Sequence, residues 1–168
     1  MGQYKTEAKS NEITAVPALL KLLDIKGCLV SLDAMGCQTS IAQTIIDKEA
    51  DYLLTVKANQ RGLHTALRQI FSQTTADNLT HIEQGHGRRE YREYQVLDAS
   101  NLPTEHDSWP KLTTLGMAVH YRVDNQGKQS LESRYYICSK TLSAEHFASA
   151  VRNHWGIESM PQAHKIAA

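Results

Sequence analysis

The chain has 168 residues, of which 41% are hydrophobic and 21% are charged, and its 18 basic and 18 acidic residues give a net charge of zero. This length suits one globular unit with an insertion, and the balanced charge argues against a self-sufficient basic DNA-binding domain. The longest apolar runs are shorter than the ~20 residues that cross a bilayer, and the polar first residues lack a secretory core. We therefore expect a cytoplasmic protein with no membrane span.

The first part of the chain alternates helical and strand patterns. Apolar residues at helical spacing predict an amphipathic helix within residues 11–27, which tolerates Pro17 if it falls in the first turn and has Gly27 as its stop signal. The next predicted segments are a buried strand at 28–32, a helix at 39–50, a second buried strand at 52–56 and a helix at 61–72. This order predicts a parallel α/β layer.

From residue 79 to residue 139 the segments take on β-character. Gly-rich or Pro-containing turns separate four such stretches, at 79–85, 89–99, 115–124 and 130–139. They predict an antiparallel sheet. Residues 143–159 then predict a helix of about four turns with Ser143 as a candidate N-cap.

The cysteines Cys28, Cys37 and Cys138 are an odd number and have no C-x-x-C spacing. This pattern argues against a disulfide framework and against a cysteine-rich zinc site. We expect reduced and mostly buried thiols.

Two acidic residues occupy positions that suit chemistry. Asp33 follows the first predicted strand, where α/β proteins commonly place functional groups, although an Asp that caps the next helix is the ordinary alternative. Glu158 lies near the end of the last helix, where an acid opposes the helix dipole, although a solvated glutamate is the default. Carboxylates that converge on one site bind Mg²⁺ or Mn²⁺, and two such ions can activate water or a 3′-hydroxyl against a phosphodiester.

Other polar residues are weaker candidates. Lys57, Asn59 and Gln60 follow the second strand, where they could hold phosphate or simply form a polar loop. His154 and Glu158 have the i, i+4 spacing of ligands on one helical face, as in a zinc-dependent hydrolase, but no H-E-x-x-H motif accompanies them.

Basic residues also cluster in the predicted hairpin. Arg88, Arg89 and Arg92 alternate with tyrosines, which suits contact with a nucleic-acid backbone and stacking on bases. Glu90 and Glu93 nearly neutralise them, so a solvated strand face explains the same pattern.

Five segments together carry a family resemblance: KSNEITAVPALLKLLDIKGCLVSLDAMGCQ, IIDKEADYLLTVKANQ, GHGRREYREYQVLD, ESRYYICS and AVRNHWGIES. From about residue 3 to residue 160 the chain resembles the H-repeat-associated, Rhs-linked insertion-sequence transposases of the DDE type. The resemblance implies an incomplete RNase H-like α/β core with a β-rich insertion, which cuts and joins DNA at the ends of a mobile element. Residues 1–72 would form part of the core, 73–140 the insertion, and 141–168 a core helix with a divergent tail.

The resemblance also implies residue roles. Asp33 resembles the second catalytic acid of the family and Glu158 the third, both as ligands for Mg²⁺ or Mn²⁺. The residues that resemble positions holding DNA or phosphate are Lys57, Asn59, Gln60, Arg88, Arg89, Arg152 and His154.

The chain departs from the family pattern at both ends. The first acid of the family lies in an upstream Asp-Gly-Lys type motif, and after Met160 the chain reads PQAHKIAA in place of a His-Trp continuation. We therefore expect a truncated fragment that holds its metal ions weakly and cleaves little or no DNA alone. The alternative is a non-catalytic DNA-binding or oligomerisation remnant of a transposase.

Overall fold

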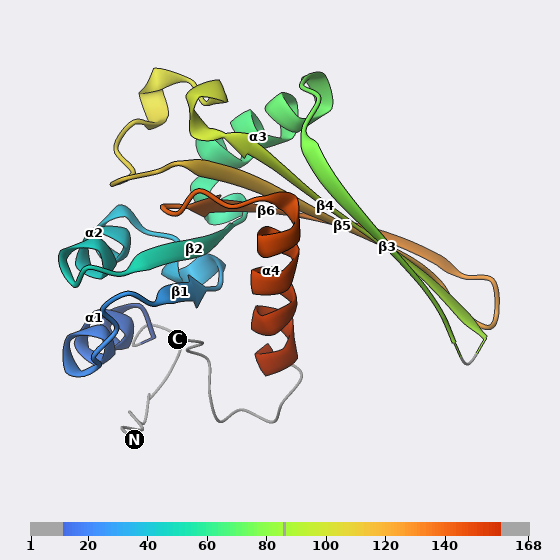
Figure 1. Cartoon of the computed structure of the whole chain (residues 1–168), viewed down its shortest axis with the longest axis horizontal. Helices are drawn as coiled ribbons and strands as arrows, with labels where there is room; N and C mark the ends of the chain where they lie inside the picture. Colours follow the sequence, from blue (N-terminus) through green and yellow to red (C-terminus); the bar gives the residue numbers. More distant parts are fainter. Residues whose placement is uncertain (1–11, 86, 159–168) are drawn as a thin grey trace.

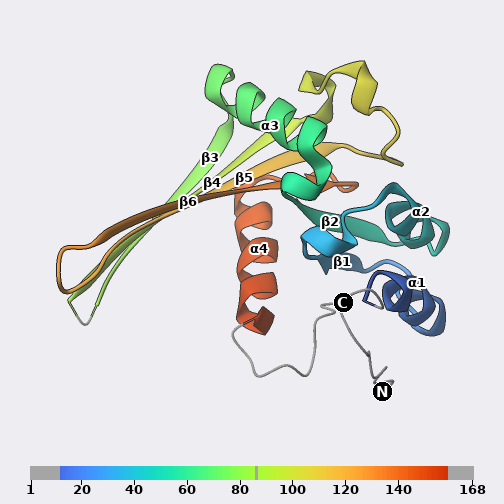
Figure 2. The same ribbon diagram turned by 180° about the vertical axis from the view of Figure 1, so that it is seen from behind.

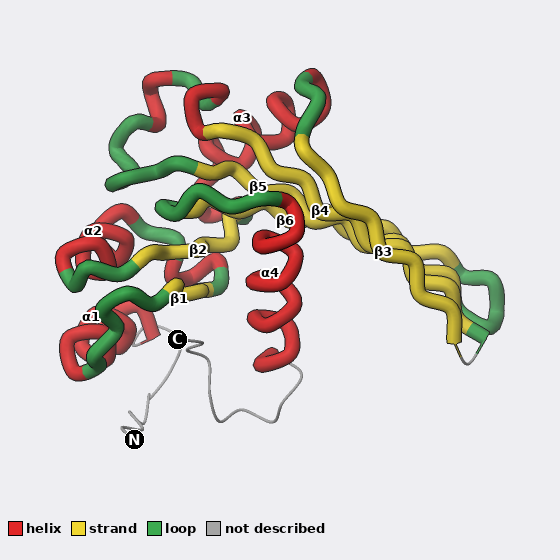
Figure 3. The backbone as a smooth tube through the Cα atoms, viewed as in Figure 1, coloured by secondary structure: helices red, strands yellow, loops and turns green. Residues whose placement is uncertain are grey.

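A computed structural model describes the backbone of residues 12–85 and 87–158 and the side chains of residues 14–85 and 87–154. These residues form one mixed six-stranded sheet with helices on both of its faces (Figures 1 and 3). The helices are α1 (Glu12–Leu22), α2 (Thr39–Asp47), α3 (Arg61–Gln73) and α4 (Ala144–Glu158). The strands are β1 (Leu29–Leu32), β2 (Asp51–Val56), β3 (Asp77–Gly85), β4 (Arg88–Asp98), β5 (Thr114–Val123) and β6 (Gln129–Cys138).

The parallel α/β layer predicted for the first part of the chain is confirmed, since β1 pairs in parallel with β2 and α2 connects them. Helix α1 differs from its prediction in two details. Pro17 lies inside the helix beyond its first turn, where its missing N–H removes a helical hydrogen bond, and the helix nevertheless continues to Leu22 with Leu20 buried in the core. The helix ends at Leu22, and Gly27 instead forms a later turn with a φ of +75°.

The antiparallel sheet predicted for the second part is also confirmed. The strand order is β1-β2-β6-β5-β4-β3, and every pairing from β2 outward is antiparallel. Strand β6 pairs with β5 along its whole length but with β2 only through Tyr135–Cys138. The β-rich segment therefore continues the sheet that β1 and β2 begin, while its division from an RNase H-like core stays a prediction.

Helices α3 and α4 cover opposite faces of the sheet near its centre (Figure 2). On the α3 face, the Phe71 and Tyr135 rings lie 6.2 Å apart, and on the α4 face Phe147 lies 5.4 Å from Tyr136. Ser143 caps α4 as expected, because its Oγ accepts the N–H of His146 at 3.2 Å. Beyond both helices, β3 to β6 continue outward as a long ribbon (Figures 1 and 2).

The expectation for the cysteines holds, since all three are free thiols and Cys37 and Cys138 are buried. Burial raises the pKa of Cys37 to about 12, which leaves its thiol protonated and unreactive near neutral pH. Within the part of the chain that the structure describes, no helix combines the length and the apolar character needed to span a membrane.

Candidate functional site

Asp33 lies where β1 ends, as the sequence predicts. Strand β1 is largely buried, and Asp33 follows it as a half-buried residue at the start of the short 3-10 turn Ala34–Gly36. The Asp33 Oδ1 atom accepts the N–H of Met35 at 3.1 Å, so the capping role is real. Because this bond uses one carboxylate oxygen, the cap is compatible with a ligand on the other oxygen.

A side-chain contact joins the end of β1 to helix α4. Ser31 Oγ lies 3.0 Å from His154 Nδ1, across 123 positions of sequence, and the Ser31 side chain is buried. Asp33 follows Ser31 by two residues, and the helix continues from His154 to Glu158. The Glu158 side chain lies outside the described residues, so its role as a catalytic acid and metal ligand stays a prediction.

The predicted loop residues after β2 secure the turn that follows Asp33. Asn59 Nδ2 donates to the carbonyl oxygen of Ala34 at 2.6 Å, and Gln60 Nε2 donates to that of Cys37 at 2.9 Å. A hollow of about 500 Å³ lies between this loop and the start of α2. Lys57, which directly follows β2, is exposed, and Asn59 and Gln60 combine a structural role with a place in the lining of this hollow.

A second hollow lies at the junction of β1 and α4. It has a volume of about 570 Å³ and is lined by residues of β1, α4 and the loop between β6 and α4. Its polar lining includes Ser31, Lys140 and Asn153. The sequence interpretation did not select Ser31, although a single hydroxyl in the apolar strand Leu29–Leu32 is a detectable signal.

The two predicted hairpin arginines lie far from Asp33. Arg88 and Arg89 are exposed at the outer end of β4, whereas β1 lies at the opposite side of the sheet (Figure 1). Arg152 is exposed on α4, and its charge acts on Tyr94: burial raises the pKa of the Tyr94 phenol, while Arg92 and Arg152 lower it. The structure thus places Arg152 and His154 on α4, with His154 beside the edge strand β1, and separates them from Arg88 and Arg89.

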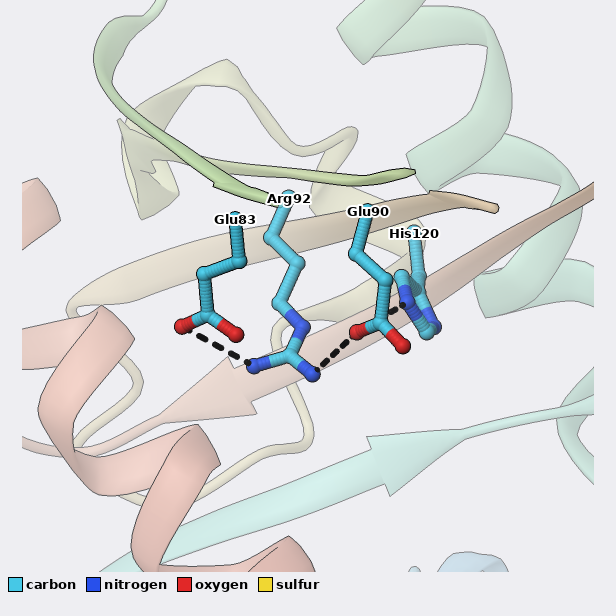
Figure 4. A network of polar contacts seen from close by, with 4 residues as sticks. All are labelled: Glu83, Glu90, Arg92 and His120. Carbon is cyan, nitrogen blue, oxygen red and sulfur yellow. Dashed lines mark hydrogen bonds and ion pairs between the residues drawn. The ribbon is translucent and has the colours of Figure 1, made fainter. Parts of the chain in front are cut away.

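The ribbon carries a network of charged side chains on the same face as α4 (Figure 4). Arg92 Nη2 lies 2.7 Å from Glu90 Oε2, and Arg92 Nη1 lies 3.9 Å from Glu83 Oε1. Burial raises the pKa of Glu90, but Arg92 and His120 outweigh it, so the pKa lies below its ordinary value. This network supports the interpretation of Arg92 and Glu90 as mutually neutralising residues.

The residues present are compatible with a divalent metal ion at Asp33. A half-buried carboxylate is the hard oxygen ligand that Mg²⁺ and Mn²⁺ prefer. Among the side chains that the structure describes, no group of three or more His, Cys, Asp or Glu residues could hold a metal ion. A metal centre at Asp33 would therefore need ligands from outside this described set, such as Glu158.

Comparison with known proteins identifies the family. The family profile described as "Transposase DDE domain" matches residues 2–160, and the chain belongs to this family. Among curated proteins it is 46% identical over 166 residues to YncI of Escherichia coli O157:H7, whose name proposes a transposase. That match covers 94% of this chain and 43% of YncI.

Two proteins of Escherichia coli strain K12 give similar matches. YbfL is 42% identical and YhhI, whose name proposes an H repeat-associated transposase, is 41% identical. Each match covers 95% of this chain and 44% of the relative. The resemblance to H-repeat-associated transposases is thus confirmed, and the chain spans less than half the length of these curated relatives.

Proposed function

We propose that this chain is part of a DDE transposase that cleaves and joins DNA at the ends of an insertion sequence. In this proposal Asp33 and Glu158 are two of the carboxylates that hold Mg²⁺ or Mn²⁺. The observation that carries it is the 3.0 Å contact between Ser31 and His154, because it joins the strand before Asp33 to the helix that continues to Glu158.

The spacing of these four residues supports convergence of the two acids. Alternation along a strand gives Ser31 and Asp33 the same side of the sheet, and they are separated by about 6.6 Å of strand. His154 and Glu158 share one face of α4 and are separated by about 6 Å of helix rise. Asp33 therefore lies two residues along the chain from the Ser31–His154 contact, and Glu158 lies about one helical turn from it.

The metal ions would activate the attacking water or 3′-hydroxyl and stabilise the leaving oxygen. The residues of this chain would hold and orient the participants. The Met35 N–H and the Asn59 amide fix the turn that carries Asp33, and Ser31 fixes the orientation of His154. Lys57 and Arg152 are exposed and would contact the phosphate backbone.

The proposed DNA-contacting set also includes Asn59, Gln60, Arg88, Arg89 and His154. Arg88 and Arg89 are exposed, and Asn59, Gln60 and His154 also form the contacts described above. Arg88 lies at the outer end of the ribbon and would contact DNA at a distance from the acids (Figure 1). Arg89 points to the opposite face of the ribbon from Arg88, because successive strand residues alternate.

The proposal is tested by direct binding of Mn²⁺ to the purified chain, followed by isothermal titration or by paramagnetic resonance. Asp33→Asn and Glu158→Gln should each weaken binding by about tenfold or more, since each removes a charged oxygen ligand. Asp98→Asn is the matched control, because Asp98 also caps a 3-10 turn, accepting the Ser100 N–H at 2.8 Å. Equal binding by all three variants contradicts the proposal.

DNA cleavage provides the second measurement. With two of three family carboxylates available, we expect little or no nicking of supercoiled plasmid by the chain alone in Mg²⁺ or Mn²⁺. Strong nicking that is lost in Asp33→Asn would confirm the catalytic acid and correct the expected inactivity. Strong nicking that survives in both Asp33→Asn and Glu158→Gln would remove the proposed site.

A further inference from the structure

Four apolar side chains form a row across the ribbon that extends beyond α3 and α4. Ile82 pairs with Tyr91, Tyr91 with Tyr121, and Tyr121 with Leu131, so the row crosses β3, β4, β5 and β6 in register. Ile82 is 68% exposed and Leu131 is 70% exposed. We call these four residues the ribbon row.

The ribbon row continues the sheet face that α3 covers. Leu131 and Tyr135 lie on one face of β6 because they are four residues apart and side chains alternate between the faces of a strand. Tyr135 packs near Phe71 of α3. In Figure 2, α3 lies over the inner sheet and the ribbon extends well past it. No described helix covers the row, in which Ile82 and Leu131 are exposed and Tyr91 and Tyr121 are half-buried.

Charge separates the two faces of the ribbon. The face shared with α4 carries the Glu83, Glu90, Arg92 and His120 network (Figure 4). On the ribbon-row face, over the described strand residues 80–85, 88–93, 119–123 and 129–133, the charged residues are Arg89 and Glu93 alone. A nearly neutral apolar face suits a protein partner better than polyanionic DNA.

The same two charges are arranged to complement a second copy. On β4, Arg89 precedes Tyr91 by two residues and Glu93 follows it by two residues. If two copies pack this face together with their β4 strands antiparallel, Arg89 of each copy lies opposite Glu93 of the other. A two-fold axis near Tyr91 generates both pairs at once, as an isologous interface requires.

We propose that the ribbon row is a self-association surface, on which a second copy of this chain packs face to face. Glu93 already accepts the Tyr91 hydroxyl at 3.1 Å and the Gln95 amide at 2.6 Å, which orients its carboxylate on this face. Neither Glu93 nor Arg89 forms an ion pair with another described residue. The second copy supplies the opposite charge to each.

The area of the row sets the strength of the association. Four strands about 4.8 Å apart and about five residues along each give a flat footprint of roughly 300 Å². Stable interfaces bury about 800 Å² per partner, so the dimer should be weak and visible only at high concentration. We expect a dissociation constant of roughly 10 µM to 1 mM.

Sedimentation velocity of the purified chain from about 5 µM to about 1 mM tests the surface, with a rise from monomer to dimer expected over that range. Leu131→Lys should raise the dissociation constant about tenfold or more, because it places a charge in the apolar row. Ser130→Lys is the matched control: it introduces the same charge at the neighbouring exposed position of β6 but faces the other side of the ribbon. Circular dichroism before each run establishes that both variants are folded.

A charge swap tests the antiparallel arrangement. Arg89→Glu and Glu93→Arg should each weaken the dimer, because each places like charges opposite one another. The double variant with both changes should regain dimerisation to within about threefold of the unmodified chain, since the pairs are restored with reversed sign. Failure of the double variant to recover overturns the proposed pairing.

Three other outcomes overturn the proposal. A chain that stays monomeric to about 1 mM has no such surface. A dimer that is unaffected by Leu131→Lys uses another face. Weaker binding of short duplex DNA by Leu131→Ala than by the unmodified chain, with both chains monomeric in sedimentation, would identify DNA as the occupant of the row.

Discussion

The inner sheet and the outer ribbon are built from the same strands but have opposite environments. Near the sheet centre, Val96 and Leu97 of β4 are both buried, one on each face, because α3 and α4 cover both sides. Farther out on the same strand, Arg89 is exposed and Tyr91 is half-buried. Hydrogen-bonded pairing thus extends the sheet well past the helices, whereas burial stops where the covering helices stop.

The largest expected effect is at the centre of the α4 face. Phe147 is fully buried and lies 5.4 Å from Tyr136 and 6.3 Å from Tyr94. Phe147→Ala should lower the free energy of unfolding by about 3–5 kcal/mol, because it leaves a cavity between α4 and the sheet. Urea denaturation at low protein concentration measures this change.

Leu131→Ala in the ribbon row is the control for that experiment. Leu131 is 70% exposed, so its truncation should change the free energy of unfolding by less than about 0.5 kcal/mol. Equal losses of unfolding free energy in Phe147→Ala and Leu131→Ala would show that the ribbon is as buried as the sheet centre in the folded state.

The next-largest expected loss of stability comes from adding a side chain at Gly116, for which Gly85 is the control. A Cβ added at Gly116 would lie 2.5 Å from the Phe147 ring, whereas a Cβ at Gly85 would meet nothing within 4 Å. Gly116→Ala should therefore destabilise the fold by about 1–3 kcal/mol through overpacking. Gly85→Ala on the ribbon should have a thermal midpoint close to that of the unmodified chain, and a large loss at Gly85 would contradict its open surroundings.

A smaller loss of stability is expected from a substitution at the junction of β1 and α4. Ser31→Ala removes the hydroxyl that contacts His154 and should cost about 1–2 kcal/mol, because the imidazole loses a partner in a buried setting. Hydrogen exchange should show faster opening of the last described turns of α4. Ser130→Ala on the exposed ribbon serves as the control, and equal exchange in both variants would show that the contact does not hold the helix.

The smallest expected effect is a pH dependence of the ribbon network. The folded pKa of Glu90 lies below its ordinary value of 4.5, so its contribution to stability is present above pH 4.5 and is lost as the pH falls through the folded pKa. Glu90→Gln should remove up to about 1 kcal/mol of that acid-dependent stability. Denaturation between neutral pH and about pH 3 measures it, and an unchanged pH profile would show that the network contributes nothing.

Much of the fold could be predicted because its signals are local. Apolar spacing placed α2 and α3 within a few residues of their observed bounds, and Ser143 was identified as a cap from its position alone. The strand-end position of Asp33 was predicted correctly for the same reason. Pro17 was misjudged, because packing of a buried neighbour overrides a local preference.

The candidate site was only partly predictable. Asn59 and Gln60 were selected as polar loop residues, but their amides point to the carbonyls of Ala34 and Cys37, which periodicity cannot reveal. Ser31 was not selected, because its partner His154 lies 123 positions away. Such contacts depend on how separate segments dock.

Local sequence patterns suffice to predict the order of helices and strands, the family, and the two acids proposed to carry chemistry. These follow from patterns that neighbouring residues carry along the chain. Three features emerge only in the folded chain: β6 pairs with both β2 and β5, β1 contacts α4, and one row of side chains aligns across four strands, namely Ile82, Tyr91, Tyr121 and Leu131. Strand register and helix docking are set by long-range packing, so no local pattern encodes them.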